Sequence, residues 1–400
     1  MNNYRYKRIF IIVADSMGTG YMEDAKLFGD EGANTLLHIG EKMPNGLNIP
    51  TLNSLGIGDF DPIKGTSIVQ HEHSYTAKAN EVSNGKDTMT GHWEIMGINT
   101  QIPFKTFTDT GFPDELIKEL EEKTGHKVIG NCAASGTEII QRLGEQQCKD
   151  NSMIVYTSSD SVLQIAAHEE IFGLDELYRC CEIAREICMK PEWMVGRVIA
   201  RPYIGTNKND FRRVTGHRHD LALRPTKETV MNVLQNNGFM TSCIGKIGDI
   251  FDQYGVVKTQ KTVSNEDGMD KTIQEAKEHD FTGICFVNLV EFDSEYGHRR
   301  NPIGYGECIE RFDKRIKELL PYLKDNDLLI ITADHGNDPT WSGTDHTREK
   351  IPLIMYSKSL NNGGYLNERK SFADIGVTIL ENFNLNKLEY MIGEKIKELL

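Results

Sequence analysis

The chain has 400 residues, of which 38% are hydrophobic and 26% are charged, and its formal net charge is -14. This composition is typical of an ordinary globular protein with a large core, and the length allows two or three domains. The negative charge excludes a general nucleic-acid binder, because attraction to a phosphate backbone requires a basic surface.

The first predicted strand is the apolar run from Ile9 to Ala14, which Asp15 follows directly. The run is much shorter than the roughly 20 apolar residues that cross a bilayer, and it is too short for the core of a signal peptide. No later run approaches that length, so we expect a cytoplasmic protein without a membrane partner. The eight cysteines form no CxxC pair, and we expect them to be free thiols.

The segment from Ser83 to Glu94 offers a candidate nucleophile, Thr88. A threonine hydroxyl attacks at neutral pH only when a base or a coordinated cation stabilises its alkoxide. If a helix begins after Asp87, its free N–H groups would favour a phosphate there. The alternative is that Thr88 only caps this helix. Two earlier histidines, His71 and His73, are expected to be exposed and are not predicted as ligands.

The middle of the chain has a different pattern and predicts an inserted domain at residues 103–222, between core segments 1–102 and 223–400. It holds two predicted helices, Pro113 to Lys123 and Leu174 to Lys190, and a predicted strand, Met153 to Tyr156. A basic cluster from Arg197 to Arg218 closes this segment. Its arginines suit bidentate phosphate contacts.

The last part of the chain alternates predicted strands and helices. The strands are Gly283 to Val290, Leu328 to Thr332 and Pro352 to Tyr356, and the helices are Lys227 to Leu234, with Thr226 as N-cap, and Cys308 to Leu323. This alternation predicts an α/β fold with a largely parallel sheet that helices cover on both faces.

Three acidic residues follow predicted strands, namely Asp15, Asp293 and Asp334. In open α/β sheets the ligand site lies beyond the carboxyl ends of the strands, so these acids are expected to meet there. Three carboxylates in a buried place repel one another strongly unless a cation binds between them. Three histidines, His298, His335 and His346, follow close behind in the sequence.

These six side chains suffice for two mixed nitrogen and oxygen sites, which suit Mn²⁺ or Zn²⁺. A two-metal site binds both the attacking and the departing oxygen of a phosphoryl transfer, which makes phosphate chemistry the leading class. An isolated Asp-His pair would be interpreted as a polar loop after a buried strand, but here the pair is one part of a larger set.

The chain closely resembles the phosphopentomutases of the alkaline phosphatase superfamily. The motifs that carry this resemblance are Gly85 to Ile95, Asp160 to Glu169, Val195 to Pro202 and Thr332 to Asp338. The resemblance implies an alkaline-phosphatase-like core interrupted by a smaller α/β cap domain. It also implies interconversion of ribose or deoxyribose 1-phosphate and 5-phosphate through a phosphorylated Thr88, which links nucleoside catabolism to pentose phosphate metabolism.

The resemblance further implies two Mn²⁺ ions per chain, with Mg²⁺, Co²⁺ or Zn²⁺ as substitutes, and a sugar 1,5- or 1,6-bisphosphate as activator. One ion would bind Asp15, Thr88, Asp334 and His335, and the other would bind Asp293, His298 and His346. The sugar phosphate would contact Ser158, Asp160, Arg197, Ile199, Arg213 and Lys246. The segment around Arg213 departs from the family pattern, which leaves Arg212 and Arg218 as alternatives. We expect a monomer whose partners are small pentose phosphates.

Two other functions use the same ligand types. A related phosphohydrolase or phosphoglycerate mutase would have the same aspartates and histidines, although a serine would suit the phosphoglycerate enzymes better than Thr88. A metal-dependent binding protein without catalysis is the third hypothesis. The sequence disfavours it, because competent residues occupy every ligand position and the nucleophile position.

Overall fold

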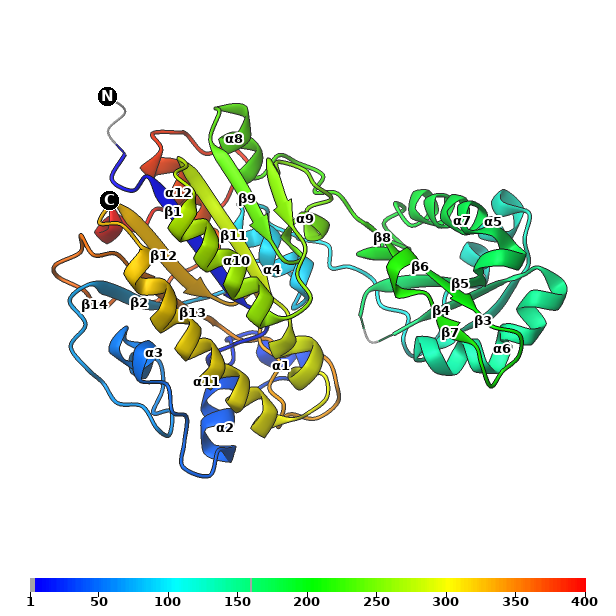
Figure 1. Cartoon of the computed structure of the whole chain (residues 1–400), viewed down its shortest axis with the longest axis horizontal. Helices are drawn as coiled ribbons and strands as arrows, with labels where there is room; N and C mark the ends of the chain where they lie inside the picture. Colours follow the sequence, from blue (N-terminus) through cyan, green and yellow to red (C-terminus); the bar gives the residue numbers. More distant parts are fainter. Residues whose placement is uncertain (1–3, 159) are drawn as a thin grey trace. The chain divides into compact units, whose positions relative to one another are not determined.

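A computed structural model describes residues 4–158 and 160–400 of the chain and divides it into two compact units (Figure 1). The larger unit consists of Met1–Pro103 and Pro225–Leu400, and the smaller unit is Phe104–Arg224. The predicted inserted domain, residues 103–222, covers nearly the same segment. The two units are described separately below.

The larger unit is built on an eight-stranded sheet with the order β10-β9-β11-β1-β12-β13-β2-β14. Its strands are β1 (Arg8–Ala14), β2 (Ser74–Ala79), β9 (Met240–Ile244), β10 (Lys258–Gln260), β11 (Gly283–Leu289), β12 (Asp327–Thr332), β13 (Ile351–Tyr356) and β14 (Gly364–Tyr365). The first five strands in this order run parallel, and β13 pairs antiparallel with both β12 and β2. The predicted α/β fold with a largely parallel sheet is confirmed.

Helices cover both faces of this sheet, which explains why its central strands are buried at every position and mostly apolar. The helices of the larger unit are α1 (Ala25–Phe28), α2 (Thr35–Lys42), α3 (Pro50–Ser54), α4 (Thr88–Ile95), α8 (Val230–Asn236), α9 (Ile247–Ile250), α10 (Asn265–Glu278), α11 (Pro302–Leu319) and α12 (Asp374–Asn382). Helix α11 packs against α2, α3 and α10, while α12 packs against α4 and α8 (Figure 1).

The register of the central strands brings their carboxyl ends to one rim. Val13 of β1 lies between Asn288 of β11 and Thr332 of β12. The residues that follow these strands therefore leave the sheet side by side. This common rim positions the candidate site.

The smaller unit has a mixed sheet with the order β3-β4-β5-β6-β7, and β8 pairs with β6. Its elements are β3 (Val128–Ala133), β4 (Met153–Thr157), β5 (Val162–His168), β6 (Arg197–Ile204), β7 (Arg212–Arg213), β8 (His219–Ala222), α5 (Asp114–Thr124), α6 (Gly136–Asp150) and α7 (Leu174–Ile187). One apolar cluster joins α5 and α7 to one face of the sheet, and a second joins α6 to the other face. This unit therefore has a core of its own.

Several predicted helix ends differ from the structure. Helix α8 begins at Val230 with Thr229 as its N-cap, so the prediction that Thr226 caps this helix is wrong. Thr229 forms a capping box with Asn232, whose side chain accepts from the Thr229 backbone N–H at 2.8 Å. Helix α11 begins at Pro302, six positions before the predicted start, because Asn301 caps it and proline is tolerated in the first turn.

Two further expectations concern the whole chain. The described residues contain no helix that is both long and apolar enough to span a membrane. All eight cysteines are free thiols, as expected from their spacing.

Candidate metal centre

The first part of the site lies where β1 and β12 end. Ligand atoms of Asp15, Asp334 and His335 lie within 4.8 Å of one another, and all three residues are buried. The Nε2 atom of His335 is 3.5 Å from Asp15 Oδ1 and 3.4 Å from Asp334 Oδ2. The Oγ1 atom of Thr88 lies 3.2 Å from the same Nε2 atom. The structure thus brings together all four residues predicted for one ion.

The second part of the site is formed by Asp293, His298 and His346. Asp293 lies in a π-helical turn after β11, and His346 lies in the loop between β12 and β13. The Nε2 atom of His298 is 3.1 Å from Asp293 Oδ2 and 3.1 Å from the Nε2 atom of His346. His335 also lies near Asp293 and His346, so the two parts adjoin each other.

Two hydrogen bonds orient the histidines toward the carboxylates. The Nδ1 atom of His298 donates to the carbonyl of Thr344 at 2.6 Å, and that of His335 donates to the carbonyl of Gly336 at 3.1 Å. A carbonyl only accepts, so each Nδ1 carries the proton and each Nε2 is left as a potential ligand atom. Metal-binding histidines in proteins are commonly oriented in this way.

The carboxylates of this cluster also have the features expected of cation ligands. Among the described residues, Asp15 Oδ1 and Asp334 Oδ2 are buried without a hydrogen-bond partner, although the Nδ1 atom of His92 lies 3.1 Å from Asp334 Oδ2. Burial, together with the charges of Asp334 and Asp293, raises the pKa of Asp15 to about 7. Burial opposes ionisation of His335, but Asp334 and Asp15 raise its pKa to about 9. Without a cation the cluster therefore holds protons, and divalent ions suit these donors.

Thr88 is the first residue of α4, and Asp87 caps this helix. The Oδ1 atom of Asp87 accepts from the backbone N–H groups of Met89 and Thr90, at 3.1 Å each. The alternative in which Thr88 only caps the helix is therefore wrong. The expectation of free N–H groups for a phosphate is also wrong for Met89 and Thr90, because the Asp87 carboxylate occupies both.

Gly91 permits a close approach between α4 and the end of β12. A Cβ atom at this position would lie 1.9 Å from the backbone carbonyl oxygen of Asp334, which cannot move aside as the end of a flexible side chain could. This contact holds the first turn of α4, and with it Thr88, against Asp334 and His335.

Replacing Gly91 with alanine is expected to separate Thr88 from His335 and to lower kcat on the order of 100-fold, because a displacement of about 1 Å at a reacting group has that effect. Steady-state kinetics of phosphoryl transfer would measure it. Gly216→Ala is the matched control, because a Cβ atom there meets no atom within 4 Å. An unchanged kcat in Gly91→Ala would contradict this role.

The residues predicted to contact the sugar phosphate divide between the two units. Lys246 belongs to the larger unit and lies at the carboxyl end of β9, between that strand and α9. Ser158, Asp160, Arg197, Ile199 and Arg213 belong to the smaller unit. There the Nη2 atom of Arg197 is 3.4 Å from Asp160 Oδ2.

The three arginines left as alternatives have different surroundings. Arg218 forms a two-pronged ion pair with Asp220, which occupies its guanidinium. The side chain of Arg213 lies beside Gly136 at the start of α6. Burial raises the pKa of Tyr156, although the positive charges of Arg201, Arg213 and Arg218 each lower it. These contacts do not distinguish Arg213 from Arg212, since both side chains are exposed on β7.

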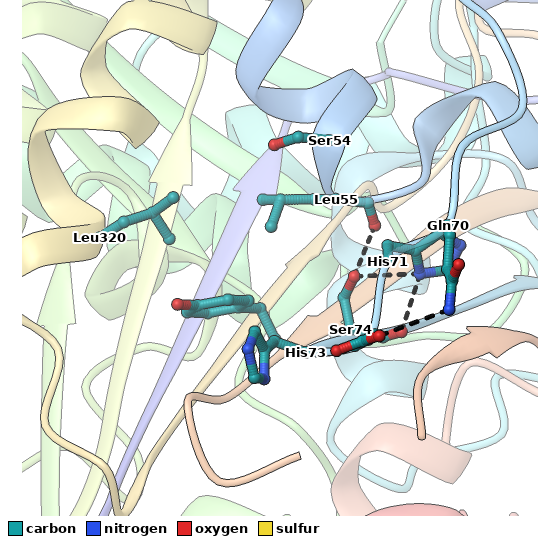
Figure 2. A pocket seen from close by; sticks show the side chains of 9 residues that line it. Ser54, Leu55, Gln70, His71, His73, Ser74 and Leu320 are labelled. Atoms are coloured by element: carbon teal, nitrogen blue, oxygen red, sulfur yellow. Dashed lines mark hydrogen bonds between the residues drawn. The ribbon is translucent and has the colours of Figure 1, made fainter. Parts of the chain in front are cut away.

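A separate pocket of about 480 Å³ lies at the other end of the larger sheet (Figure 2). Tyr356 lines this pocket and pairs with Leu329 near the start of β12, whereas Asp334 follows the end of that strand.

The expectation that His71 is exposed is wrong. Its Nε2 atom is 2.7 Å from Asp59, and its Nδ1 atom is 2.8 Å from the Ser74 carbonyl.

Comparisons with known proteins bear on this geometry. The model of the Metalloenzyme superfamily matches residues 7–387. A phosphopentomutase of Clostridium beijerinckii is 55% identical over 392 residues, which are 98% of each chain. The chain belongs to the phosphopentomutase family. A second member, from Agathobacter rectalis, is 54% identical over 98% of this chain and 99% of its own.

Family membership confirms the predicted class of enzyme, an isomerase that acts as an intramolecular phosphotransferase. It also agrees with the metal cluster, since the family lies within a superfamily of metalloenzymes. Among solved structures, a phosphoglycerate mutase of Leishmania mexicana aligns over 98% of each chain with 11% identity and a TM-score of 0.48. That likeness is too distant to bear on the function of the chain.

Several residues that support the site were not predicted from the sequence. The Nδ2 atom of Asn288 donates to Asp15 Oδ2 at 2.9 Å, and that of Asn337 donates to Asp293 Oδ1 at 2.7 Å. His92 donates through Nδ1 to the carbonyl of Thr88 at 2.8 Å. His92 lies inside the motif Gly85 to Ile95, four residues after Thr88, and Asn337 lies inside the motif Thr332 to Asp338.

Arg348 was also missed, although it follows His346 by two residues. Its buried guanidinium donates to Glu81 Oε2 at 2.7 Å, to the Ser83 carbonyl at 2.9 Å and to Asp24 Oδ2 at 2.9 Å. These contacts fix the segment that leads to Thr88 against the loop that carries His346. A side chain with several donors in one plane suits this position better than lysine does.

Proposed function

We propose that the chain interconverts ribose or deoxyribose 1-phosphate and the corresponding 5-phosphate in the cytoplasm. Thr88 would carry the phosphoryl group, and a sugar 1,5- or 1,6-bisphosphate would prime it. Two Mn²⁺ ions would bind at the rim cluster, which consists of Asp15, Asp293, His298, Asp334, His335 and His346. The observation that carries this proposal is the position of Thr88 Oγ1, which lies 3.2 Å from His335 Nε2, next to the buried Asp15 and Asp334. The membership of the chain in the phosphopentomutase family supports the same reaction.

The residues present fit two divalent ions. Asp15, Thr88, Asp334 and His335 would hold one ion, and Asp293, His298 and His346 would hold the other. Bound at these positions, such ions supply Lewis acidity that stabilises a threonine alkoxide and neutralises charge on a transferring phosphoryl group. Mn²⁺ suits a set with three histidines better than Mg²⁺ does, while Co²⁺ and Zn²⁺ suit it as substitutes.

The reaction uses Thr88 twice. In the primed enzyme the phosphorus–Oγ1 bond of phosphothreonine breaks while a new bond forms to the free hydroxyl oxygen of the sugar monophosphate. The resulting bisphosphate reorients, and Thr88 Oγ1 then forms a bond to the other phosphorus while the bond from that phosphorus to the sugar oxygen breaks. The proton lost by the sugar hydroxyl in the first transfer is balanced by the proton that the released sugar oxygen takes up in the second. Water must be excluded during this exchange, because it would otherwise release free phosphate. We infer that the smaller unit acts as the cap that excludes it.

The smaller unit would also hold the phosphate that does not react. Arg197 and Ile199 lie at alternate positions of β6, so their side chains share one face of that strand. Asp160 and Arg197 form one pair, and Arg213 lies near the start of α6. We propose that these residues and Ser158 bind the sugar phosphate together with Lys246 of the larger unit.

Replacing Arg197 with alanine is expected to raise KM for ribose 5-phosphate roughly 10- to 100-fold, since a charge-assisted hydrogen bond contributes about 1.5 to 3 kcal/mol. Initial rates over a range of substrate concentrations would give KM and kcat separately. The matched control is Arg142→Ala in the same unit, because Arg142 is exposed on α6 and pairs with Glu138 at 3.7 Å. A KM increase of equal size in both variants would contradict a specific contact.

The direct test of the reaction uses the purified chain with Mn²⁺, a sugar bisphosphate and ribose 5-phosphate. Ribose 1-phosphate is the expected product, and deoxyribose 5-phosphate tested in parallel gives the sugar preference. Absence of any sugar 1-phosphate would overturn the proposal. Release of free phosphate instead would favour the phosphohydrolase hypothesis, and turnover of 3-phosphoglycerate would favour the phosphoglycerate mutase. We propose a monomer, which light scattering would test.

A further inference from the structure

The smaller unit contains a cluster of metal-ligand types that has no part in the proposed reaction. Ligand atoms of His126, Glu176 and Cys180 lie within 4.8 Å of one another. His126 lies between α5 and β3, while Glu176 and Cys180 are four residues apart on α7. This spacing places both α7 side chains on one face of the helix, toward the imidazole.

The hydrogen bonds of His126 leave one ring nitrogen for a ligand. Its Nδ1 atom donates to the carbonyl of Asn151 at 3.0 Å, and its Nε2 atom lies 2.9 Å from Glu176 Oε1. A neutral ring therefore directs its Nε2 lone pair at a carboxylate oxygen, which is repulsive unless a proton or a metal ion lies between them. The ring also packs against Phe172, with the two centroids 4.4 Å apart, which holds its orientation.

Glu176 is ionised, and its Oε1 atom contacts both His126 Nε2 and Arg179 Nη2. Hydrogen bonds from Arg179, and then from His126, lower the pKa of Glu176 to about 2 against the effect of burial. The Nε atom of Arg179 donates to Glu176 Oε2 at 2.9 Å, while its Nη2 atom donates to Glu176 Oε1 at 2.5 Å and to the Thr124 carbonyl at 2.8 Å. An ion at Oε1 would displace the Nη2 contact with that oxygen and leave Arg179 with its contacts to Oε2 and to Thr124.

Cys180 supplies the sulfur ligand. Its Sγ atom is 3.8 Å from Glu176 Oε1, and the residue has no exposed surface. Burial and the charge of Glu176 raise the pKa of this thiol to about 12. Without a metal the sulfur is therefore protonated, and a bound ion would displace that proton to solvent as the metal–thiolate bond forms.

The 3.8 Å between Cys180 Sγ and Glu176 Oε1 matches one edge of a tetrahedral site, whereas the 2.9 Å between His126 Nε2 and Glu176 Oε1 is shorter than such an edge and would lengthen around an ion. Bonds of about 2.0 to 2.3 Å from one ion to nitrogen, oxygen and sulfur place the ligand atoms roughly 3.3 to 3.8 Å apart. We propose that His126, Glu176 and Cys180 form a binding site for a borderline transition-metal ion of the Zn²⁺ class, which fastens the segment before β3 to α7. A water molecule would complete the coordination.

The test uses Co²⁺ with the full-length chain under reducing conditions. A thiolate bound to Co²⁺ absorbs in the near ultraviolet, whereas the rim cluster of aspartates, histidines and Thr88 has no sulfur ligand. We expect this band to appear in the wild type, to saturate at one ion per chain and to be displaced by Zn²⁺. No band in the wild type would overturn the site.

Two variants and a matched control complete the test. Cys180→Ser and His126→Ala should each lower the band at least tenfold, while Cys148→Ser, which replaces another free thiol of the same unit, should leave it unchanged. If Cys180→Ser fails to fold, His126→Ala and Glu176→Gln decide the result. A band that persists in these variants would overturn the assignment. Asp334→Asn should retain the band, which separates this site from the proposed catalytic centre.

Discussion

Replacing Thr88 with alanine is expected to lower the rate of phosphoryl transfer at least on the order of 1,000-fold, because the proposed carrier hydroxyl is lost. The fold should be little changed, since Asp87 and not Thr88 caps α4. Divalent ions should still bind, because the buried carboxylates and histidines remain. The loss should therefore appear in kcat rather than in stability.

Two measurements check this prediction. Mass spectrometry of the Thr88 peptide after incubation with a labelled bisphosphate should detect phosphothreonine in the wild type and none in Thr88→Ala. Thr88→Ser, which keeps a hydroxyl, should retain part of the exchange. Thr226→Ala is the control, because Thr226 is an exposed threonine of the larger unit. Persistent exchange in Thr88→Ala would mean that another residue carries the group.

Removing divalent ions is expected to lower the melting temperature by roughly 5 to 10 °C, with a larger loss at high pH. Burial and neighbouring carboxylates raise the pKa of Asp15 to about 7. Burial opposes the rise at His335, but Asp334 and Asp15 raise its pKa to about 9. The folded, metal-free chain therefore binds both protons more tightly than the unfolded chain does.

The sign of the pH effect follows from these values. Both raised groups stabilise the metal-free fold at low pH, and their contribution is lost as the pH rises through about 7 and about 9. Ion binding requires the deprotonated ligands and so strengthens over the same range. Melting curves would be recorded at pH 6, 7.5 and 9, with chelator or with excess Mn²⁺. The difference in melting temperature between the two conditions should widen as the pH rises. Re-addition of Mn²⁺ is the control, and an equal gap at every pH would contradict this linkage.

Much of the larger unit could be predicted from local sequence. The buried strands β1, β11 and β12 are short apolar runs, and an acidic residue follows each of them closely. Parallel strands end at one rim, so the meeting of Asp15, Asp293 and Asp334 followed from the expected topology. Helix ends were less predictable, because Thr226 and Thr229 are both possible caps in sequence, and Thr229 is the one that forms a capping box, with Asn232.

The sequence by itself determined the strands, the ligand types and the candidate nucleophile, because apolar runs and side-chain chemistry are local properties. Only the tertiary structure decided how these parts meet. The close approach of Gly91 to Asp334 and the reach of Arg348 to Ser83 join segments more than 240 residues apart. Such contacts depend on packing across the whole core, where one added atom is felt, and no local pattern of the chain encodes them.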